Sequence, residues 1–113
     1  MRELVKIAKA LSDETRVRML KLLLEKDICV REMQEIFNIS QPQVSRHLKI
    51  LMDAGFLKRW REGKCVAYFT ERDGDNVFLL DALSKSFNDN PIVSGDREKL
   101  QQALALLLRE KAR

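Results

Sequence analysis

The chain has 113 residues, of which 45% are hydrophobic and 34% are charged, with four glycines and two prolines. This composition suits one helix-rich globular domain, residues 1–113, and excludes a disordered or fibrous chain. The 21 Lys and Arg against 17 Asp and Glu give a net charge of +4, which permits nucleic-acid binding without establishing it. No apolar run is long enough to cross a bilayer and no secretion signal opens the sequence, so we expect a cytoplasmic protein with reduced cysteines.

Apolar residues repeat at helical spacing in the N-terminal part of the chain and predict two helices. The first covers Leu4 to Leu11 and carries one apolar stripe. Ser12 is a good N-cap for the second helix, where Asp13 and Glu14 place negative charge at the positive helix end. The second helix has a broad apolar stripe from Val17 to Leu24, so we expect it at the centre of the core.

Two further short helices joined by a tight turn predict a helix-turn-helix. The first covers Val30 to Phe37 and should stop at Asn38. The second opens with a capping box, in which the Ser40 hydroxyl accepts the Gln43 amide proton and the Gln43 side chain reaches back to Ser40. Val44, Leu48 and Leu51 are predicted to form its buried face. Gly55 is predicted to end the helix in a left-handed conformation.

The apolar spacing changes from helical to strand-like after this helix. Phe56 to Arg61 and Cys65 to Thr70 predict two strands joined by a turn at Glu62-Gly63, where Gly supplies a positive φ. We interpret this hairpin as the wing of a winged helix-turn-helix. Side chains alternate between the two faces of a strand, so Arg59 and Arg61 share one face and Trp60 lies on the other. Trp60 and Tyr68 are expected to pack on the core.

The last part of the chain is predicted to contain two helices separated by a linker. Residues 73–76 form a loop, and a helix covers Val77 to Phe87. The linker covers residues 88–95 and contains Pro91. Residues 96–111 predict a strong helix, because its leucines follow helical spacing and its acidic and basic ends match the helix dipole.

Four segments of the chain resemble the ArsR family of metal- and stress-responsive repressors: Ala10 to Arg16, Ile39 to Leu48, Ala54 to Leu57 and Arg61 to Lys64. The resemblance extends from about Leu4 to Phe69, and its most specific part is the capped helix, its terminating Gly and the wing. It implies a mainly α fold with a small β-hairpin. It also implies a dimeric transcriptional repressor that blocks its own operator and releases it when an inducer binds.

The face of the proposed recognition helix opposite its apolar stripe is polar. Gln and Arg can form paired hydrogen bonds with base edges, and Lys suits phosphate, although an ordinary solvated helix face is the alternative. With the cations of the wing, the predicted DNA-binding residues are Gln41, Gln43, Ser45, Arg46, His47, Lys49, Arg59, Arg61 and Lys64. His47 lies at the margin of the apolar stripe, where packing and a hydrogen bond to a neighbour are the other interpretation.

The family resemblance implies a homodimer whose interface is formed by the first and last helices, residues 1–11 and 96–113. The predicted interface residues are Leu4, Ile7, Leu11, Leu100, Leu104 and Leu107. Packing of the last helix on its own domain is the alternative.

The signal that such a repressor would sense is less well defined. Metal-sensing relatives carry a Cys-x-Cys pair, but this chain has Cys29 followed by Arg31 at the second position, and one thiolate cannot hold a pyramidal As(III) ion. Because His47 is the single histidine, the family's zinc site on the last helix is not expected. Cys29 is a candidate ligand for As(III) or another thiophilic ion, or an oxidation-sensitive thiol with a pKa lowered by Lys26 and Arg31. A buried apolar role is equally open for Cys29, and Cys65 is expected to lie apart from it as a strand filler.

Other classes of function are less well supported by the residues. A single histidine without clustered acids cannot assemble a hydrolytic triad or a metal-hydroxide site, so no enzyme is predicted. A winged-helix module for protein contacts and a DNA-binding regulator without a small inducer are the two alternatives to an inducible repressor.

Overall fold

The computed structural model describes residues 1–72 and 74–112. The expected loop at residues 73–76 is a short 3-10 helix from Gly74 onward, and its first residue lies outside the described part. The elements in chain order are α1 (Arg2–Ala10), α2 (Glu14–Leu23), β1 (Ile28–Cys29), α3 (Val30–Phe37), α4 (Gln41–Asp53), β2 (Leu57–Glu62), β3 (Cys65–Thr70), η1 (Gly74–Asn76), α5 (Val77–Lys85) and α6 (Pro91–Ala112). No helix of the described residues is long and apolar enough to cross a membrane.

The core is formed mainly by α2, α3 and α4. Helix α4 packs on both α2 and α3 and buries Val44, Leu48 and Leu51 completely, as the apolar stripe predicted. The predicted end of α3 at Asn38 and the predicted left-handed Gly55 after α4 are also confirmed; φ is 88° at Gly55, and Asn38 is left-handed as well, with φ of 52°. A fully buried aliphatic side chain contributes about 1.5–3 kcal/mol, so this stripe holds α4 firmly against the body.

In the described part of the chain the sheet has three strands, one more than the predicted hairpin. All pairs are antiparallel in the order β1-β3-β2, and the two-residue strand β1 pairs Ile28 with Tyr68 and Cys29 with Ala67. A two-residue segment before a helix carries too little periodicity to be recognised as a strand. β1 therefore attaches the base of the wing to the start of α3.

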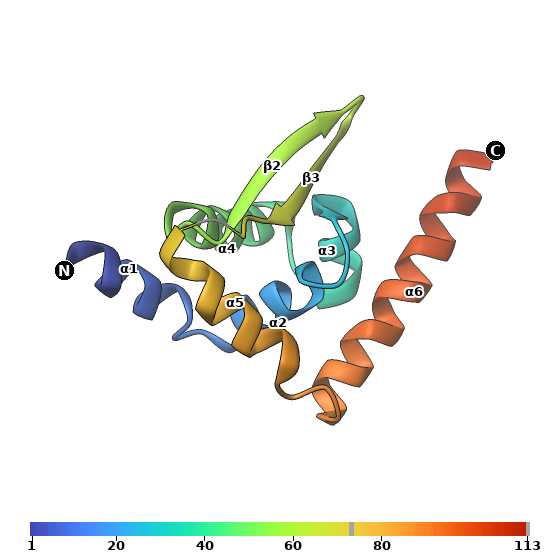
Figure 1. The fold of residues 1–113 in the computed structure, drawn as a ribbon. Helices are drawn as coiled ribbons and strands as arrows, with labels where there is room; N and C mark the ends of the chain where they lie inside the picture. The colour runs from blue at the N-terminus through green and yellow to red at the C-terminus, as the bar shows by residue number, and fades with distance from the viewer. Residues whose placement is uncertain (73, 113) are drawn as a thin grey trace.

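The wing differs from its prediction at the turn and at one aromatic residue. β2 continues to Glu62, which pairs with Cys65, so Gly63 and Lys64 form the turn. Tyr68 is buried as expected, but Trp60 is 42% exposed. The two lie on opposite faces, because directly paired residues share a face and Trp60 pairs with Ala67. The wing extends beyond the body of the molecule, so only its base can reach the core (Figure 1).

Helix α1 begins at Arg2, two residues before the predicted Leu4, and the predicted starts of α2 and α6 are wrong. Asp13, not Ser12, caps α2: its carboxylate accepts from the Arg16 backbone N–H at 3.1 Å. Ser12 instead donates from Oγ to the Lys9 carbonyl at 2.7 Å. Helix α6 begins at Pro91 rather than at residue 96, because Pro is well tolerated in the first turn of a helix.

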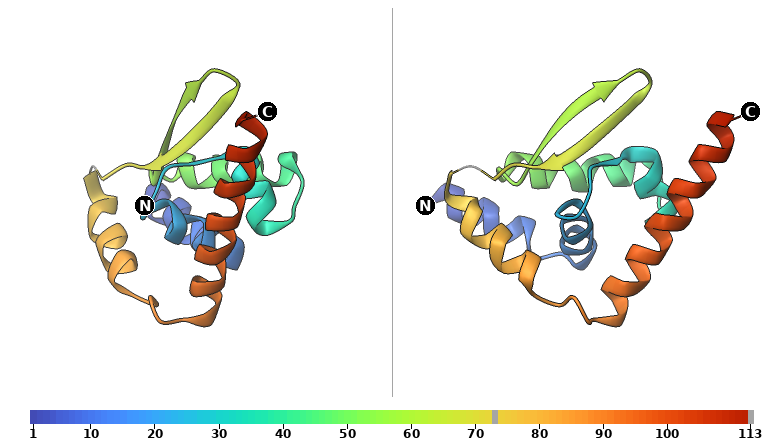
Figure 2. Two further views of the ribbon diagram at one scale, coloured as in Figure 1. Left: turned by 90° about the vertical axis from the view of Figure 1, so that its right-hand side faces the viewer. Right: turned by 45° about the vertical axis from the view of Figure 1, so that its right-hand side comes forward.

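Helix α6 packs on its own subunit. It contacts α3 and α2, and Leu100 and Ala103 are each only 4% exposed. Asp96, which was expected at the start of the helix, is buried and accepts from Arg18 at 2.7 and 2.9 Å. Figures 1 and 2 show α1 and α5 at one end of the molecule and the C-terminal part of α6 at the other.

Candidate nucleic-acid interface

Helix α4 begins with the predicted capping box. The Gln43 backbone N–H donates to Ser40 Oγ at 3.3 Å, and the Ser40 backbone N–H donates to Gln43 Oε1 at 2.9 Å. Pro42 occupies the first turn, where its missing N–H would have no partner within the helix. The cap defines where α4 starts, and the apolar stripe of α4 defines which side faces outward.

The outward side of α4 carries most of the predicted DNA-binding residues. Gln41, Gln43, Arg46 and Lys49 are exposed, and Ser45 is partly exposed. The Gln41 amide donates to Ser45 Oγ at 3.1 Å, and Lys49 forms an ion pair with Asp53 at 2.9 Å. Together these residues cover the broad exposed side of α4, which we call its polar row.

Gln43 was predicted both as part of the capping box and as a DNA contact, and its capping role occupies its side-chain oxygen. Its Oε1 accepts from both the backbone N–H and the hydroxyl of Ser40, at 2.9 and 3.1 Å. An amide oxygen has two lone pairs, so the acceptor of Gln43 is engaged in the cap. Gln41 and Arg46 are therefore the better placed side chains for paired hydrogen bonds with a base edge.

The wing places its cations away from the body. Arg59 and Arg61 are exposed and share one face of β2, and Lys64 lies exposed in the turn. Tyr68 lies opposite Arg59 on that face, where it anchors the base of the wing in the core. The arrangement offers a second cationic contact point beside the polar row of α4.

His47 lies half-buried on α4 and faces Arg16. Its Nδ1 is 3.4 Å from Arg16 Nη1. Burial lowers the pKa of His47, and the nearby charges of Arg16 and Arg46 lower it further, while Asp13 opposes them. The interpretation of His47 as a packed residue with a hydrogen-bonded neighbour agrees with this geometry. Arg16 was missed, because nothing local in the sequence indicates that the start of α2 contacts α4.

The two cysteines lie together, contrary to the expected separation. Cys29 pairs with Ala67, and Cys65 lies two residues from Ala67 on the same face of β3. Cys29 is 8% exposed, and burial, together with hydrogen bonds to the Glu32 side chain and to Cys65, raises its pKa to about 12. The expected lowering of this pKa by nearby cations is therefore wrong.

The cysteine pair does not fit a three-thiolate ion. Within residues 1–72 and 74–112, no group of three or more His, Cys, Asp and Glu side chains is suited to hold a metal. Glu32 is buried beside Cys29 and accepts from the Cys29 backbone N–H through Oε1 at 2.9 Å, while its Oε2 has no hydrogen-bond partner among the residues that the structure describes. The site thus offers two thiols next to a buried carboxylate.

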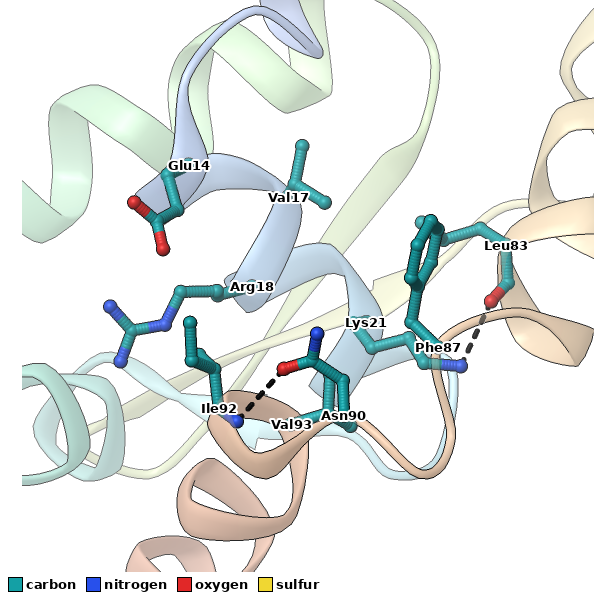
Figure 3. A pocket seen from close by; sticks show the side chains of 9 residues that line it. All are labelled: Glu14, Val17, Arg18, Lys21, Leu83, Phe87, Asn90, Ile92 and Val93. Carbon is teal, nitrogen blue, oxygen red and sulfur yellow. Dashed lines mark hydrogen bonds between the residues drawn. The ribbon is translucent and has the colours of Figure 1, made fainter.

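A small hollow of about 180 Å³ lies between α2, α5 and the start of α6 (Figure 3). Its two cationic side chains already have partners. Lys21 donates to the Leu83 and Ser84 carbonyls and to Asn88 Oδ1 at 2.7–3.2 Å, and Arg18 pairs with Asp96. These contacts hold the end of α5 and the start of α6 against α2, which is a structural role.

Comparisons with known proteins agree with this geometry. Residues 13–59 match the family described as "Bacterial regulatory protein, arsR family". The chain is 43% identical over 63 residues to the arsenic resistance transcriptional regulator ArsR1 of Pseudomonas putida, which covers 55% of this chain and 49% of that protein. It is 36% identical over 87 residues to the transcriptional repressor SdpR of Bacillus subtilis, covering 74% of this chain and 96% of SdpR. The chain thus spans about half the length of ArsR1 and nearly all of SdpR.

Solved structures show the same fold. HlyU from Vibrio cholerae superimposes with a TM-score of 0.64 at 26% identity, covering 73% of this chain and 88% of HlyU. The homodimeric winged helix-turn-helix DNA-binding domain of Mb0332 from Mycobacterium bovis gives a TM-score of 0.64 at 24% identity, with coverage of 80% and 82%. The chain therefore belongs to the ArsR family of transcriptional regulators and has the winged helix-turn-helix fold.

Proposed function

We propose that this protein is a sequence-specific DNA-binding repressor that places α4 of each subunit of a homodimer in the major groove. One observation carries the proposal: a capped helix with a fully buried apolar side presents Gln41, Arg46 and Lys49 outward beside a cationic wing. The major groove admits an α-helix, and Arg can form two hydrogen bonds with guanine. Arg46 would read bases, and Lys49 would contact phosphate.

The wing would contact the DNA backbone beside the groove that α4 enters. Arg59, Arg61 and Lys64 carry positive charge at a distance from α4, so the two contact points together fix the orientation of the domain on the duplex. Because cations on phosphate release counterions, binding should weaken steeply as salt rises.

For the dimer we propose a face formed by α1 and α5. Leu4 and Val5 on α1 are 60% and 47% exposed, and Phe78 on α5 is 78% exposed. Among the residues expected at the interface from the last helix, Leu100 is buried in its own subunit, and Leu104 packs against the same core. A specific dimer buries about 1,600 Å² in total, and the exposed apolar residues of α1 and α5 can supply the centre of such a patch.

The signal that releases the repressor would act on the thiols of Cys29 and Cys65. The pair lies where β1 attaches the wing to α3. A chemical change at either sulfur would therefore alter the position of the wing relative to the helix-turn-helix. Two thiols suit an agent that engages two sulfurs, such as a two-coordinate thiophilic ion or a thiol oxidant, better than inorganic As(III), which takes three thiolates. The thiolate is the reactive form of cysteine, and the raised pKa of Cys29 keeps its thiol protonated at neutral pH. The release reaction should therefore become faster as the pH rises.

The proposal is tested by selecting duplexes from a random DNA library and measuring their affinity by fluorescence anisotropy. Arg46→Ala should weaken the selected duplex by ~1–3 kcal/mol and relax the base preference, while Lys64→Ala should weaken all duplexes alike and reduce the salt slope by about one. Unchanged binding by Arg46→Ala would show that α4 does not read bases. A protein that selects no duplex at low salt would instead support a module for protein contacts.

The proposed signal has a separate test. Cys29→Ser and Cys65→Ser should each keep the DNA affinity of the parent and lose release by a mercuric salt or a mild thiol oxidant. If both variants respond like the parent, the signal acts elsewhere. If no agent releases the parent, the protein is a regulator without a thiol-reactive inducer.

A further inference from the structure

Arg16 connects three helices through one guanidinium group. Its Nε donates to the Ala10 carbonyl and its Nη2 to the Lys9 carbonyl, both at 2.9 Å. Its Nη1 lies 3.4 Å from Nδ1 of His47 on α4 and 3.9 Å from the carboxylate of Asp13. The side chain is only 13% exposed, so its position is set by the protein rather than by solvent.

The contacts with α1 use two carbonyls at the C-terminal end of the helix, which have no donor within the helix. Arg16 donates to both, and the Lys9 carbonyl also accepts from the backbone N–H and the hydroxyl of Ser12. The guanidinium is planar and always charged, with N–H groups in a rigid fork, so the direction of the remaining N–H groups follows from the first two contacts. The end of α1 therefore determines where Nη1 points.

The contact with His47 then has a defined proton arrangement. Arg16 can only donate, so His47 Nδ1 accepts and the imidazole proton is on Nε2. Burial and the charges of Arg16 and Arg46 keep the pKa of His47 below the ordinary histidine value, against the opposing effect of Asp13. The ring is thus neutral at pH 7, as the hydrogen bond requires.

We propose that Arg16 and His47 are positioning residues for DNA recognition, and that their hydrogen bond sets the rotation of α4 relative to the end of α1. The apolar stripe of α4 is held by packing, which has little directional preference, whereas the hydrogen bond from Arg16 is directional. Arg46, the proposed base-reading residue, is the immediate neighbour of His47, so a rotation that breaks this bond also moves Arg46. The inference rests on the proposed function, since it assigns a role in DNA binding.

The same contact has a second consequence if α1 lies in the dimer face. In a dimeric helix-turn-helix protein the two recognition helices must match half-sites about 34–36 Å apart. Arg16 would then transmit the position of α1 to α4 in each subunit. His47 is thereby assigned to positioning rather than to a direct DNA contact.

The arrangement predicts a pH dependence with a definite sign. The charged groups that act on His47 are Asp13 and Arg16 from α2 and its cap, and Arg46 from α4, while α1 faces Arg16 with carbonyl oxygens. Protonation of Nδ1 removes the acceptor and places a second positive charge beside Arg16. The contact is therefore present above the lowered pKa of His47 and is lost as the pH falls through it.

The test compares the parent with three variants on the duplex that the parent selects. Between about pH 8 and about pH 5, affinity of the parent should fall severalfold. His47→Asn keeps an acceptor near the position of Nδ1 but cannot titrate, so it should bind like the parent at the higher pH and lose the fall. His47→Leu and Arg16→Lys should bind about tenfold more weakly at the higher pH, which corresponds to ~1.4 kcal/mol. The salt slope should stay unchanged in all three, because no phosphate contact is removed.

Two results would overturn the proposal. Tighter parent binding at low pH, with a salt slope reduced by about one in His47→Asn, would mean that a protonated His47 contacts phosphate. Parent-like affinity of both Arg16→Lys and His47→Leu would mean that the contact does not position α4. Thermal unfolding by circular dichroism identifies a variant that fails to fold. In that case the proposal is decided by the conservative His47→Asn, through its DNA affinity at the higher pH and the loss of the pH dependence. Failure of the proposed function is distinct, because the parent would then select no duplex.

Discussion

Helices α4 and α6 both pack against α2 and α3, but different interactions hold them there. α4 has its own capping box and buries three aliphatic side chains completely. α6 buries Leu100 and Ala103 and adds an ion pair between the buried Asp96 and the partly exposed Arg18. The difference lies in how each helix is fixed: α4 by a cap within its own first turn, α6 in part by a partner distant in sequence. The cap can be predicted locally, whereas the partner of Asp96 depends on the completed fold.

The largest effect is expected where the packing of α4 is removed. Leu48→Ala leaves a cavity at a fully buried position and should lower the free energy of unfolding by ~2–5 kcal/mol. Urea denaturation followed by circular dichroism measures the change. Lys49→Ala, on the exposed side of the same turn, is the matched control and should change stability by about 0.5 kcal/mol or less. Equal losses in the two variants would contradict the orientation of α4.

A smaller effect is expected when the ion pair of α6 is broken. Asp96→Asn keeps the size of the side chain but leaves Arg18 without its carboxylate partner, so stability should fall by ~1–3 kcal/mol. The loss is moderated because the Arg18 side chain is 27% exposed and can regain water. Glu98→Gln, at an exposed position of α6, is the control for charge alone. If Asp96→Asn unfolds at the same urea concentration as the parent, the apolar contacts of α6 are sufficient to hold it against the rest of the domain.

The smallest effect is expected at the cap of α4. Ser40→Ala removes the acceptor for the Gln43 backbone N–H and should cost ~1 kcal/mol. Ser40→Asp restores an acceptor at the same position and should recover most of this stability. A loss in both variants would indicate that the hydroxyl acts through another contact, and no loss in either would mean that the cap is dispensable.

The bounds of α3 and α4, the capping box, the buried stripe and the left-handed Gly55 were all predictable from the sequence. Each depends on residues within a few positions of one another. The polar row of α4 was predictable for the same reason, since helical spacing determines which residues share a face.

The features that were missed depend on contacts between distant segments. β1 exists because Ile28 and Cys29 meet β3, and the same pairing brings Cys65 to Cys29. Arg16 gains its role only when α1, α2 and α4 have assembled. The start of α6 was misjudged because Pro91 suits both a linker and a first helical turn, and the local sequence does not distinguish the two.

The two-residue strand β1 has a mechanical consequence for the wing. A hairpin attached only by its own ends could swing as a unit, but here the outer edge of β3 is bonded to the residue that opens α3. The wing and the helix-turn-helix should therefore move as one rigid piece. Breaking this short attachment, for example by Ile28→Pro, would let the wing sample many orientations. The two proposed DNA contacts, through α4 and through the wing, would then form at the same time less often.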